Sequence, residues 1–275
     1  GKTFTLVGTP LDAISADNVL FADGSALVTS GEANDFATDL HGTDHDDLLI
    51  GGPLGQLHRV SESATQVSAN RGALDPSTSD DGRLVVFTSD STNFGINDTN
   101  GISDIYLKNL ETGFITRVST NSNGSQATSW YLGSSAASIS SDGSCVVFES
   151  WANNLVGSDT NDTSDIFRKD LLTGATTRIS TSGTGSEANG DSYGASVSDD
   201  GRYVAFYSYA TNLVGSDSNG SSDVFVKDTL TGQVTLASAS ASGVQGNATG
   251  PYEGSRSPTL SANGQYVLFL SHSTN

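Results

Sequence analysis

The sequence is poor in the residues that anchor a chain to a membrane or cross-link it. Cys145 is the one cysteine in 275 residues, so no disulfide can form within the chain. No apolar run approaches the roughly 18 residues of a membrane-spanning helix. The first residues, GKTFTLVGTP, lack the charged start and apolar core of a signal peptide. We therefore expect no membrane insertion.

Basic residues are also scarce. There are 12 Lys and Arg against 31 Asp and Glu, which gives a formal net charge of −19 at pH 7. This charge opposes binding to the phosphates of nucleic acids and to anionic membrane surfaces, so we expect neither partner. Methionine is absent as well. Because reading frames start with Met, we expect a processed chain or a fragment of a larger protein.

Glycine is abundant, with 31 residues, as are Ser, Thr and Asn, a composition typical of a turn-rich β protein. One segment recurs about every 60 residues, each time with a turn glycine followed by a phenylalanine. Its copies are DDGRLVVFTS, SDGSCVVFES, DDGRYVAFYS and ANGQYVLFLS, with Gly82, Gly143, Gly201 and Gly264 and with Phe87, Phe148, Phe206 and Phe269. Such apolar runs between Asp-Gly or Asn-Gly turns predict buried strands.

A second strand follows in three copies, SDIYLKN, SDIFRKD and SDVFVKD, and a Thr-Gly turn then leads into FITRVS, ATTRIS and QVTLAS. With the short segment ahead of each Asp-Gly turn, each repeat has four strands joined by hairpins, the pattern of a propeller blade. Over residues 57–275 this pattern resembles the bacterial TolB-type β-propeller repeats. The resemblance implies a fold and not a function, since such propellers serve as binding scaffolds and as parts of peptidases and lyases.

The predicted fold class is all-β, a β-propeller segment of about three and a half four-stranded blades that forms a partial ring of a larger propeller. The repeats cover 59–116, 117–177, 178–235 and 236–275, and the last stops in mid-blade. Residues 1–56 form an N-terminal segment with short strands, which either precedes the blades or completes one. Because a partial ring leaves strand edges unpaired, we expect the remaining blades from downstream sequence or from another chain.

An acidic loop with the spacing D-x-N-x-x-x-D leads into the second strand of three repeats. Its copies are Asp98, Asn100 and Asp104; Asp159, Asn161 and Asp165; and Asp217, Asn219 and Asp223. Calcium takes roughly six to eight oxygen ligands, so these side chains with nearby carbonyls predict a calcium site in each loop. The loop resembles, in shorter form, the calcium loops of integrin-type propeller repeats. The alternative is turn chemistry, because Asp, Asn, Ser and Gly satisfy the backbone groups of turns.

A further acidic stretch, HGTDHDDLLIGGPLG, lies upstream. It resembles one unit of the RTX calcium-binding nonapeptide, with Asp44, Asp46 and Asp47 ahead of a Gly-Gly pair. His45 stands where that family has Gly, and the following unit is degenerate. The resemblance implies a calcium site or the remnant of one. Because the motif belongs mostly to exported bacterial proteins, it favours a secreted protein, with the periplasm as the alternative location.

Catalytic signals are weak. GDSYG around Ser192 matches the G-x-S-x-G nucleophile elbow, but its surroundings predict neither a buried strand before it nor a helix after it, so we expect no nucleophile there. Arg59, Arg117 and Arg178 share one repeat position on the outermost strand. We interpret them as a solvated, salt-bridging face rather than as an anion-binding cluster.

The function that these features favour is a non-catalytic binding scaffold of a secreted bacterial protein, with calcium in the loops of its blades. The alternative is the propeller domain of a larger hydrolase or polysaccharide lyase whose catalytic residues lie outside this chain. No motif identifies the ligand, whether protein or polysaccharide.

Overall fold

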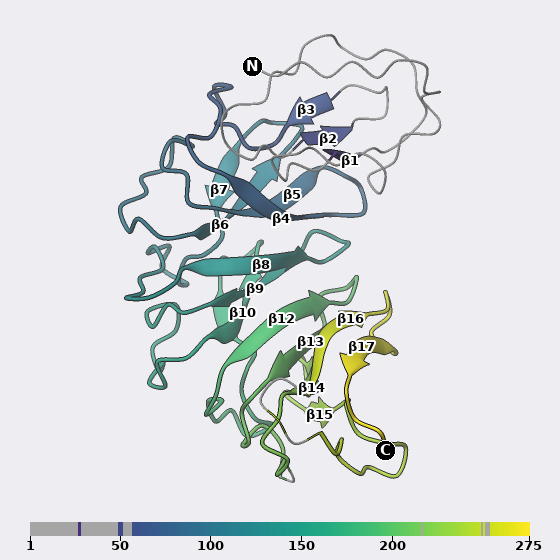
Figure 1. Ribbon diagram of the computed structural model, residues 1–275. Helices are drawn as coiled ribbons and strands as arrows, with labels where there is room; N and C mark the ends of the chain where they lie inside the picture. Colours follow the sequence, from purple (N-terminus) through teal and green to yellow (C-terminus); the bar gives the residue numbers. More distant parts are fainter. Residues whose placement is uncertain (1–26, 29–48, 52–56, 216, 249, 251–253) are drawn as a thin grey trace, which may run out of the picture.

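The computed structural model describes residues 27–28, 49–51, 57–215, 217–248, 250 and 254–275. In these residues the regular structure consists of strands, and none of it is a helix long and apolar enough to cross a membrane. Three antiparallel sheets of four strands form the body of the molecule, and each is one propeller blade (Figure 1). The predicted all-β propeller fold is confirmed.

Each blade pairs its strands in chain order. The first blade consists of β4 (Ala73–Thr78), β5 (Leu84–Ser89), β6 (Asp104–Asn109) and β7 (Ile115–Arg117). The second consists of β8 (Ser134–Ile139), β9 (Cys145–Ser150), β10 (Asp165–Asp170) and β11 (Thr176–Arg178). The third consists of β12 (Ser192–Val197), β13 (Tyr203–Ser208), β14 (Asp223–Asp228) and β15 (Val234–Leu236).

Smaller sheets lie at the two ends of this series (Figure 1). After the third blade, β16 (Ser255–Leu260) pairs with β17 (Val267–Ser271). Before the first blade, β1 (Leu27–Val28) pairs in parallel with β2 (Leu49–Gly51), which pairs antiparallel with β3 (Leu57–Arg59). Strand β2 belongs to the stretch that resembles an RTX unit. The acidic residues of that stretch, Asp44, Asp46 and Asp47, lie outside the described residues.

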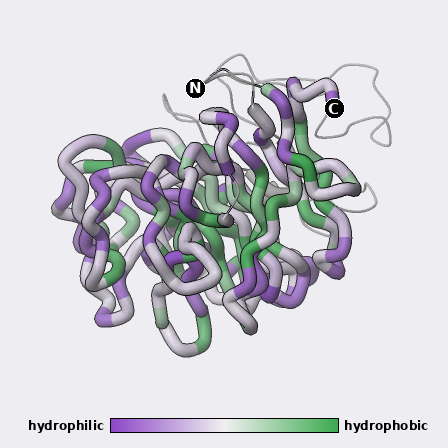
Figure 2. Tube along the Cα trace, turned by 90° about the horizontal axis from the view of Figure 1, so that it is seen from below, coloured by the Kyte–Doolittle hydropathy of each residue, from purple (hydrophilic) through white to green (hydrophobic). Residues whose placement is uncertain are grey.

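Apolar side chains fill the space between neighbouring blades. Val86 and Ile105 of the first blade pack with Val146, Phe148 and Phe167 of the second in one buried cluster. A second cluster joins the second blade to the third in the same way. In Figure 2 the hydrophobic segments run through the interior and the hydrophilic segments gather in the outer loops. Burial on both faces explains why these strands read as continuous Val and aromatic runs.

The turn glycines found in the sequence have the backbone conformation that only glycine adopts without strain. Gly82, Gly143, Gly201 and Gly264 have φ angles of 66°, 69°, 70° and 67°. A side chain at such an angle is disfavoured, so the repeated Asp-Gly and Asn-Gly pairs mark where each first hairpin must turn.

The first strand of each blade, and the first strand of the sheet after the third blade, contains a bulge: β4, β8, β12 and β16. The residues at the bulge have positive φ angles of 51°, 50°, 61° and 54°: Asp75, Ala136, Gly194 and Ser257. A bulge bends and twists its strand, which suits the strand that lies closest to the next blade. These first strands contact one another from blade to blade.

Backbone hydrogen bonds also connect successive blades. The first residue of β8 and of β12, Ser134 and Ser192, donates its N–H to the carbonyl of Ser103 and Ser164 in the preceding blade, each at 2.8 Å. Ser255 at the start of β16 repeats this bond to the third blade at 2.7 Å. The blades are therefore tied by main chain as well as by apolar packing.

Three buried lysines tie each blade to the segment that precedes it. Lys108, Lys169 and Lys227 are 4%, 7% and 7% exposed. Each ammonium group bonds to the segment that leads into its own blade: Lys108 Nζ donates to the carbonyl of Glu62, after β3, at 2.9 Å, and Lys227 Nζ donates to that of Thr181, after β11, at 2.9 Å. Burial lowers the pKa of all three, that of Lys227 to about 8.

Candidate functional site

The acidic loops lie between the second and third strands of each blade. The last Asp of each loop is the first residue of the third strand, and Asp104, Asp165 and Asp223 are at most 1% exposed. Each is held by a serine from the segment after the fourth strand: Ser119, Ser180 and Ser238 donate their hydroxyls at 2.5, 2.5 and 2.6 Å. A buried carboxylate needs such donors, so the loop geometry is fixed from both sides.

The first loop closes around an arginine. Arg117, at the end of β7, places Nε 3.1 Å from Asp104 Oδ2 and Nη2 3.6 Å from Asp98 Oδ1. Its side chain is 6% exposed, and those of the two aspartates are 2% or less. The interpretation of this arginine as part of a solvated face is therefore wrong. The outermost strand turns this side chain inward, where the acidic loop covers it.

The second loop surrounds Arg178 in the same way and adds a third acid. Arg178 Nη1 lies 2.8 Å from Asp165 Oδ2 and 3.8 Å from Asp159 Oδ1, and it also contacts Glu187. Carboxylate oxygens of Asp159, Asp165 and Glu187 lie within 4.8 Å of one another, a grouping that could hold a metal ion. The guanidinium group already occupies the space between these oxygens, so a metal there competes with it.

The third loop has no arginine, because Leu236 of β15 takes the repeat position of Arg117 and Arg178. Asp217 and Asp223 instead share one amide. Gln245 Nε2 donates to Asp217 Oδ1 at 2.7 Å and to Asp223 Oδ2 at 2.8 Å. Within the described residues no ion pair is formed by either carboxylate. Of the three loops, this one brings two acids together without a cation.

The predicted loop asparagines use their side chains for turn geometry. Asn100 Oδ1 accepts the N–H of Ile102 at 3.0 Å, and Asn219 Oδ1 accepts that of Ser221 at 2.8 Å. The amide nitrogens point the other way, and that of Asn161 donates to the carbonyl of Ala188 at 2.8 Å. These bonds are the turn chemistry that the sequence analysis held as the alternative to ligation.

A residue that the sequence analysis missed completes each cluster. Gln126, Glu187 and Gln245 come from the segment that follows each fourth strand, and Gln126 Nε2 donates to Asp98 Oδ1 at 2.6 Å. The signal was present in the sequence, since each lies two residues after a glycine, at Gly124, Gly185 and Gly243. A Gln or Glu occurs at the same position of each repeat, after the fourth strand and outside the acidic loop, and this recurrence could have identified the residue.

Burial has the largest effect on the pKa values of these carboxyl groups. It raises the pKa of Asp159 to about 6, with the negative charge of Asp165 adding to the effect and Arg178 opposing it. It also raises the pKa of Asp104, of Asp165 and of Asp217. For Asp217 the neighbouring Asp223 adds to the rise. A bound cation lowers such pKa values, so these clusters favour positive charge.

The serine of the GDSYG segment is part of the blade framework. Ser192 is the first residue of β12 and is fully buried, and its Oγ donates to Ser208 Oγ on the neighbouring strand at 2.9 Å. Ser134 and Ser150 make the same bond in the second blade. The position repeats because it pairs two strands, in agreement with the expectation of no nucleophile there.

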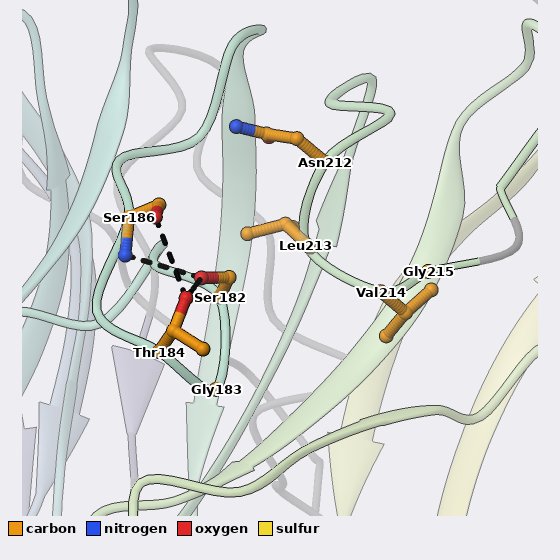
Figure 3. Close-up of a pocket in the computed structure, with 8 residues that line it drawn as sticks. All are labelled: Ser182, Gly183, Thr184, Ser186, Asn212, Leu213, Val214 and Gly215. Atoms are coloured by element: carbon orange, nitrogen blue, oxygen red, sulfur yellow. Dashed lines mark hydrogen bonds between the residues drawn. The ribbon is translucent and has the colours of Figure 1, made fainter.

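A hollow of about 410 Å³ lies at the third blade beside the turn at Ser182–Ser186 and the loop from Asn212 to Gly215 (Figure 3). Its hydroxyl groups bond to one another, with Ser182 Oγ 3.0 Å from Thr184 Oγ1. Its lining contains no ionisable side chain. A second cavity, at the junction of the second and third blades, has Tyr131, Trp151 and Tyr193 in its walls.

No protein-family model matches the chain, and no curated protein does either. Among solved structures, TolB from Acinetobacter baumannii is 20% identical with a TM-score of 0.46, over 81% of this chain and 42% of that one. TolB from Agrobacterium tumefaciens is 17% identical with a TM-score of 0.40, over 66% and 52%. An oligogalacturonate lyase from Vibrio parahaemolyticus is 15% identical with a TM-score of 0.39, over 66% and 40%. The chain spans about half the length of these proteins or less, and no functional conclusion follows from similarity at this level.

Proposed function

We propose that the chain is a non-catalytic binding scaffold, the blade segment of an exported bacterial protein, with the periplasm as the alternative location. One observation supports this role above others: the buried charged groups are used to hold the strands and segments of the blades together. Arg117 and Arg178 pair with the buried acids Asp104 and Asp165 of their own blades, and Lys227 of the third blade donates to the carbonyl of Thr181 in the segment that follows the second blade. Groups committed to the framework in this way hold a surface in place rather than react with a substrate.

Within this scaffold we place calcium in the third loop. In the first two loops the arginine supplies the positive charge that Asp98 and Asp104, or Asp159 and Asp165, need. In the third loop that charge is missing because of Leu236. The carboxylate and amide oxygens of this loop are ligands that calcium prefers.

The geometry of the third loop supports one ion between the two carboxylates. Oxygens of Asp217 and Asp223 both lie within 2.8 Å of Gln245 Nε2, so they converge on one point. Turning the Gln245 amide by half a rotation would present its oxygen there as a third ligand, in exchange for the bond that Gln245 Oε1 accepts from the N–H of Ser218 at 3.0 Å. Few protein ligands indicate a weak site with a dissociation constant of about 10⁻⁴–10⁻³ M. The upstream acids Asp44, Asp46 and Asp47 are a separate calcium proposal.

Thermal unfolding across a calcium titration tests this assignment, with chelator and magnesium as references. At ten times the dissociation constant, calcium should stabilise the wild-type chain by about 1.4 kcal/mol. Leu236→Arg supplies the guanidinium of the other loops and should remove the third loop's share of the calcium response while leaving the fold intact. Asp217→Asn should abolish it as well.

The matched control is Asp98→Asn, which removes the equivalent acid from the arginine-filled first loop. This variant should keep the full calcium response. If Leu236→Arg still responds to calcium as the wild type does, the ion does not bind in the third loop.

A further inference from the structure

The cavity at the junction of the second and third blades contains residues that do not recur at the same positions of the other blades. Its volume is about 460 Å³. The lining comes from the segment entering β8, the end of β9 and the start of β12, together with Ser103 of the first blade: Ser103, Tyr131, Leu132, Gly133, Ser134, Ser135, Glu149, Trp151 and Tyr193. Strands β8, β9 and β12 contact one another, and β8 and β12 are the first strands of adjacent blades (Figure 1).

Aromatic rings form the walls of the cavity and continue over the surface beside it. Tyr131 meets Trp151 edge to face with ring centres 5.2 Å apart, and Trp130 lies 5.6 Å from Tyr131. Tyr193 lies 5.7 Å from Tyr207 on the other side. Trp130 and Tyr131 are 74% and 57% exposed. Large aromatic groups gathered on a surface mark a binding site more often than a structural one.

A carboxylate lies among these rings. Glu149 Oε1 accepts the hydroxyl of Ser135 at 2.9 Å, and Oε2 accepts the N–H of Gly194 at 3.0 Å. The second bond crosses to the third blade, where the bulge at Gly194 turns the N–H toward Glu149. Both bonds come from neutral groups. Across the part of the chain that the structure describes, no Lys or Arg pairs with Glu149, so its charge is oriented but not neutralised.

The framework repeats, whereas this cavity does not. The serine pairs, acidic loops and lysines recur from blade to blade, but the repeat position of Glu149 holds Thr88 in the first blade and Tyr207 in the third. The position of Trp151 holds Asp90 and Tyr209 in those blades. Packing alone would favour the same residues in each copy, so a specific role in one blade junction accounts for the difference.

We propose that this cavity binds an alkylammonium cation. Tyr131, Trp151 and Tyr193 line the cavity, and a cation over an aromatic face is attracted by the ring quadrupole. The Glu149 carboxylate adds a full negative charge, no basic side chain lines the cavity, and the chain carries a formal charge of −19. An anionic ligand is repelled from this site, and a neutral sugar leaves the charge of Glu149 unmatched.

This inference deepens the proposed scaffold role by naming the class of ligand, and it does not depend on calcium. The test is a titration of the full chain with choline chloride in the presence of chelator, followed by tryptophan fluorescence and calorimetry. Sodium chloride at equal concentration corrects for ionic strength. Trp130 and Trp151 are the two tryptophans of the chain, so the fluorescence reports on this region directly.

Choline should bind the wild-type chain with half-saturation in the millimolar range or below. Glu149→Gln keeps a hydrogen-bond acceptor at the same place but removes the charge, and it should weaken binding at least tenfold. Glu111→Gln is the matched control, because Glu111 is 60% exposed on a hairpin of the first blade. This control removes the same charge from the molecule and should leave choline binding unchanged.

Two further probes distinguish the source of the cation. Nα-acetyl-lysine amide represents a lysine side chain, and phosphatidylcholine vesicles represent a lipid headgroup; whichever binds with the same dependence on Glu149 identifies the source. Choline that fails to bind at 10 mM, or binds equally to Glu149→Gln, overturns the proposal. Cellobiose binding that is unaffected by Glu149→Gln, without choline binding, assigns the cavity to neutral sugars instead. If the chain shows no calcium response, the calcium proposal fails, but the choline measurements, which are made in chelator, still test this cavity.

Discussion

One residue position decides the charge balance of each acidic loop. Arg117 and Arg178 neutralise their loops, and Leu236 leaves the third without a cation. A buried charge is stable when it is paired and costly when its partner is removed. The three loops therefore occupy the same position in their blades but differ in net charge, so we expect them to respond differently to loss of the arginine.

Replacing the arginines by the leucine of the third repeat should destabilise the chain unequally. Arg178→Leu leaves Asp159, Asp165 and Glu187 without a cation, and we expect a loss of about 3–5 kcal/mol at pH 7. Arg117→Leu leaves two acids bridged by Gln126, the arrangement that the third loop already has, so its loss should be clearly smaller. Urea unfolding in chelator measures both. Equal losses would show that the guanidinium charge is not what stabilises these loops.

Among the elements, the strands were the most predictable from the sequence. The Asp-Gly turns and the Val and Phe runs correspond to the first hairpin and the buried second strand, β5, β9 and β13, because their pattern reflects local conformation and burial. The bulges in β4, β8, β12 and β16 were not predicted, since Asp75 and Ala136 are ordinary residues whose left-handed backbone depends on the neighbouring blade.

The candidate site was predicted only in part, for a related reason. The spacing of Asp98, Asn100 and Asp104 located the loop. Whether Arg117 points to solvent or into the loop depends on how the fourth strand meets the next repeat, and spacing within the loop carries no information about that contact. The same holds for Gln126, which approaches from a distant segment.

The buried lysines make the contact between each blade and the segment that precedes it dependent on pH. Burial lowers the pKa of Lys227 from 10.5 to about 8. Between these values the unfolded chain binds a proton that the folded chain does not, so stability from this group rises as pH increases from about 8 to 10.5. Lys227→Met should lack this rise. Urea unfolding at pH 7.5, 9 and 10 measures it, with Arg71→Met as an exposed control. Parallel pH profiles for wild type and Lys227→Met would contradict the assignment.

On the scale of the whole molecule, the chain is a series of similar blades whose repeated polar groups hold neighbours together. Serine pairs, acidic loops and lysines recur, whereas Leu236 in the cation-poor third loop and Glu149 in the cavity each differ from the residues at the same position in the other blades. In repeat proteins each unit contacts mainly its neighbours, so a variation of this kind acts locally and leaves the other blades as they are.

The central claim is that the third loop differs from the other two because it lacks the arginine and takes up calcium. Hydrogen exchange of the wild-type chain with calcium and with chelator tests this most directly, because it assigns any protection to a segment. The account predicts that calcium slows exchange in residues 217–223 and 243–248, with the first two loops unchanged. Protection that is spread equally over the three loops, or that is found only in the loops of Arg117 and Arg178, would contradict it.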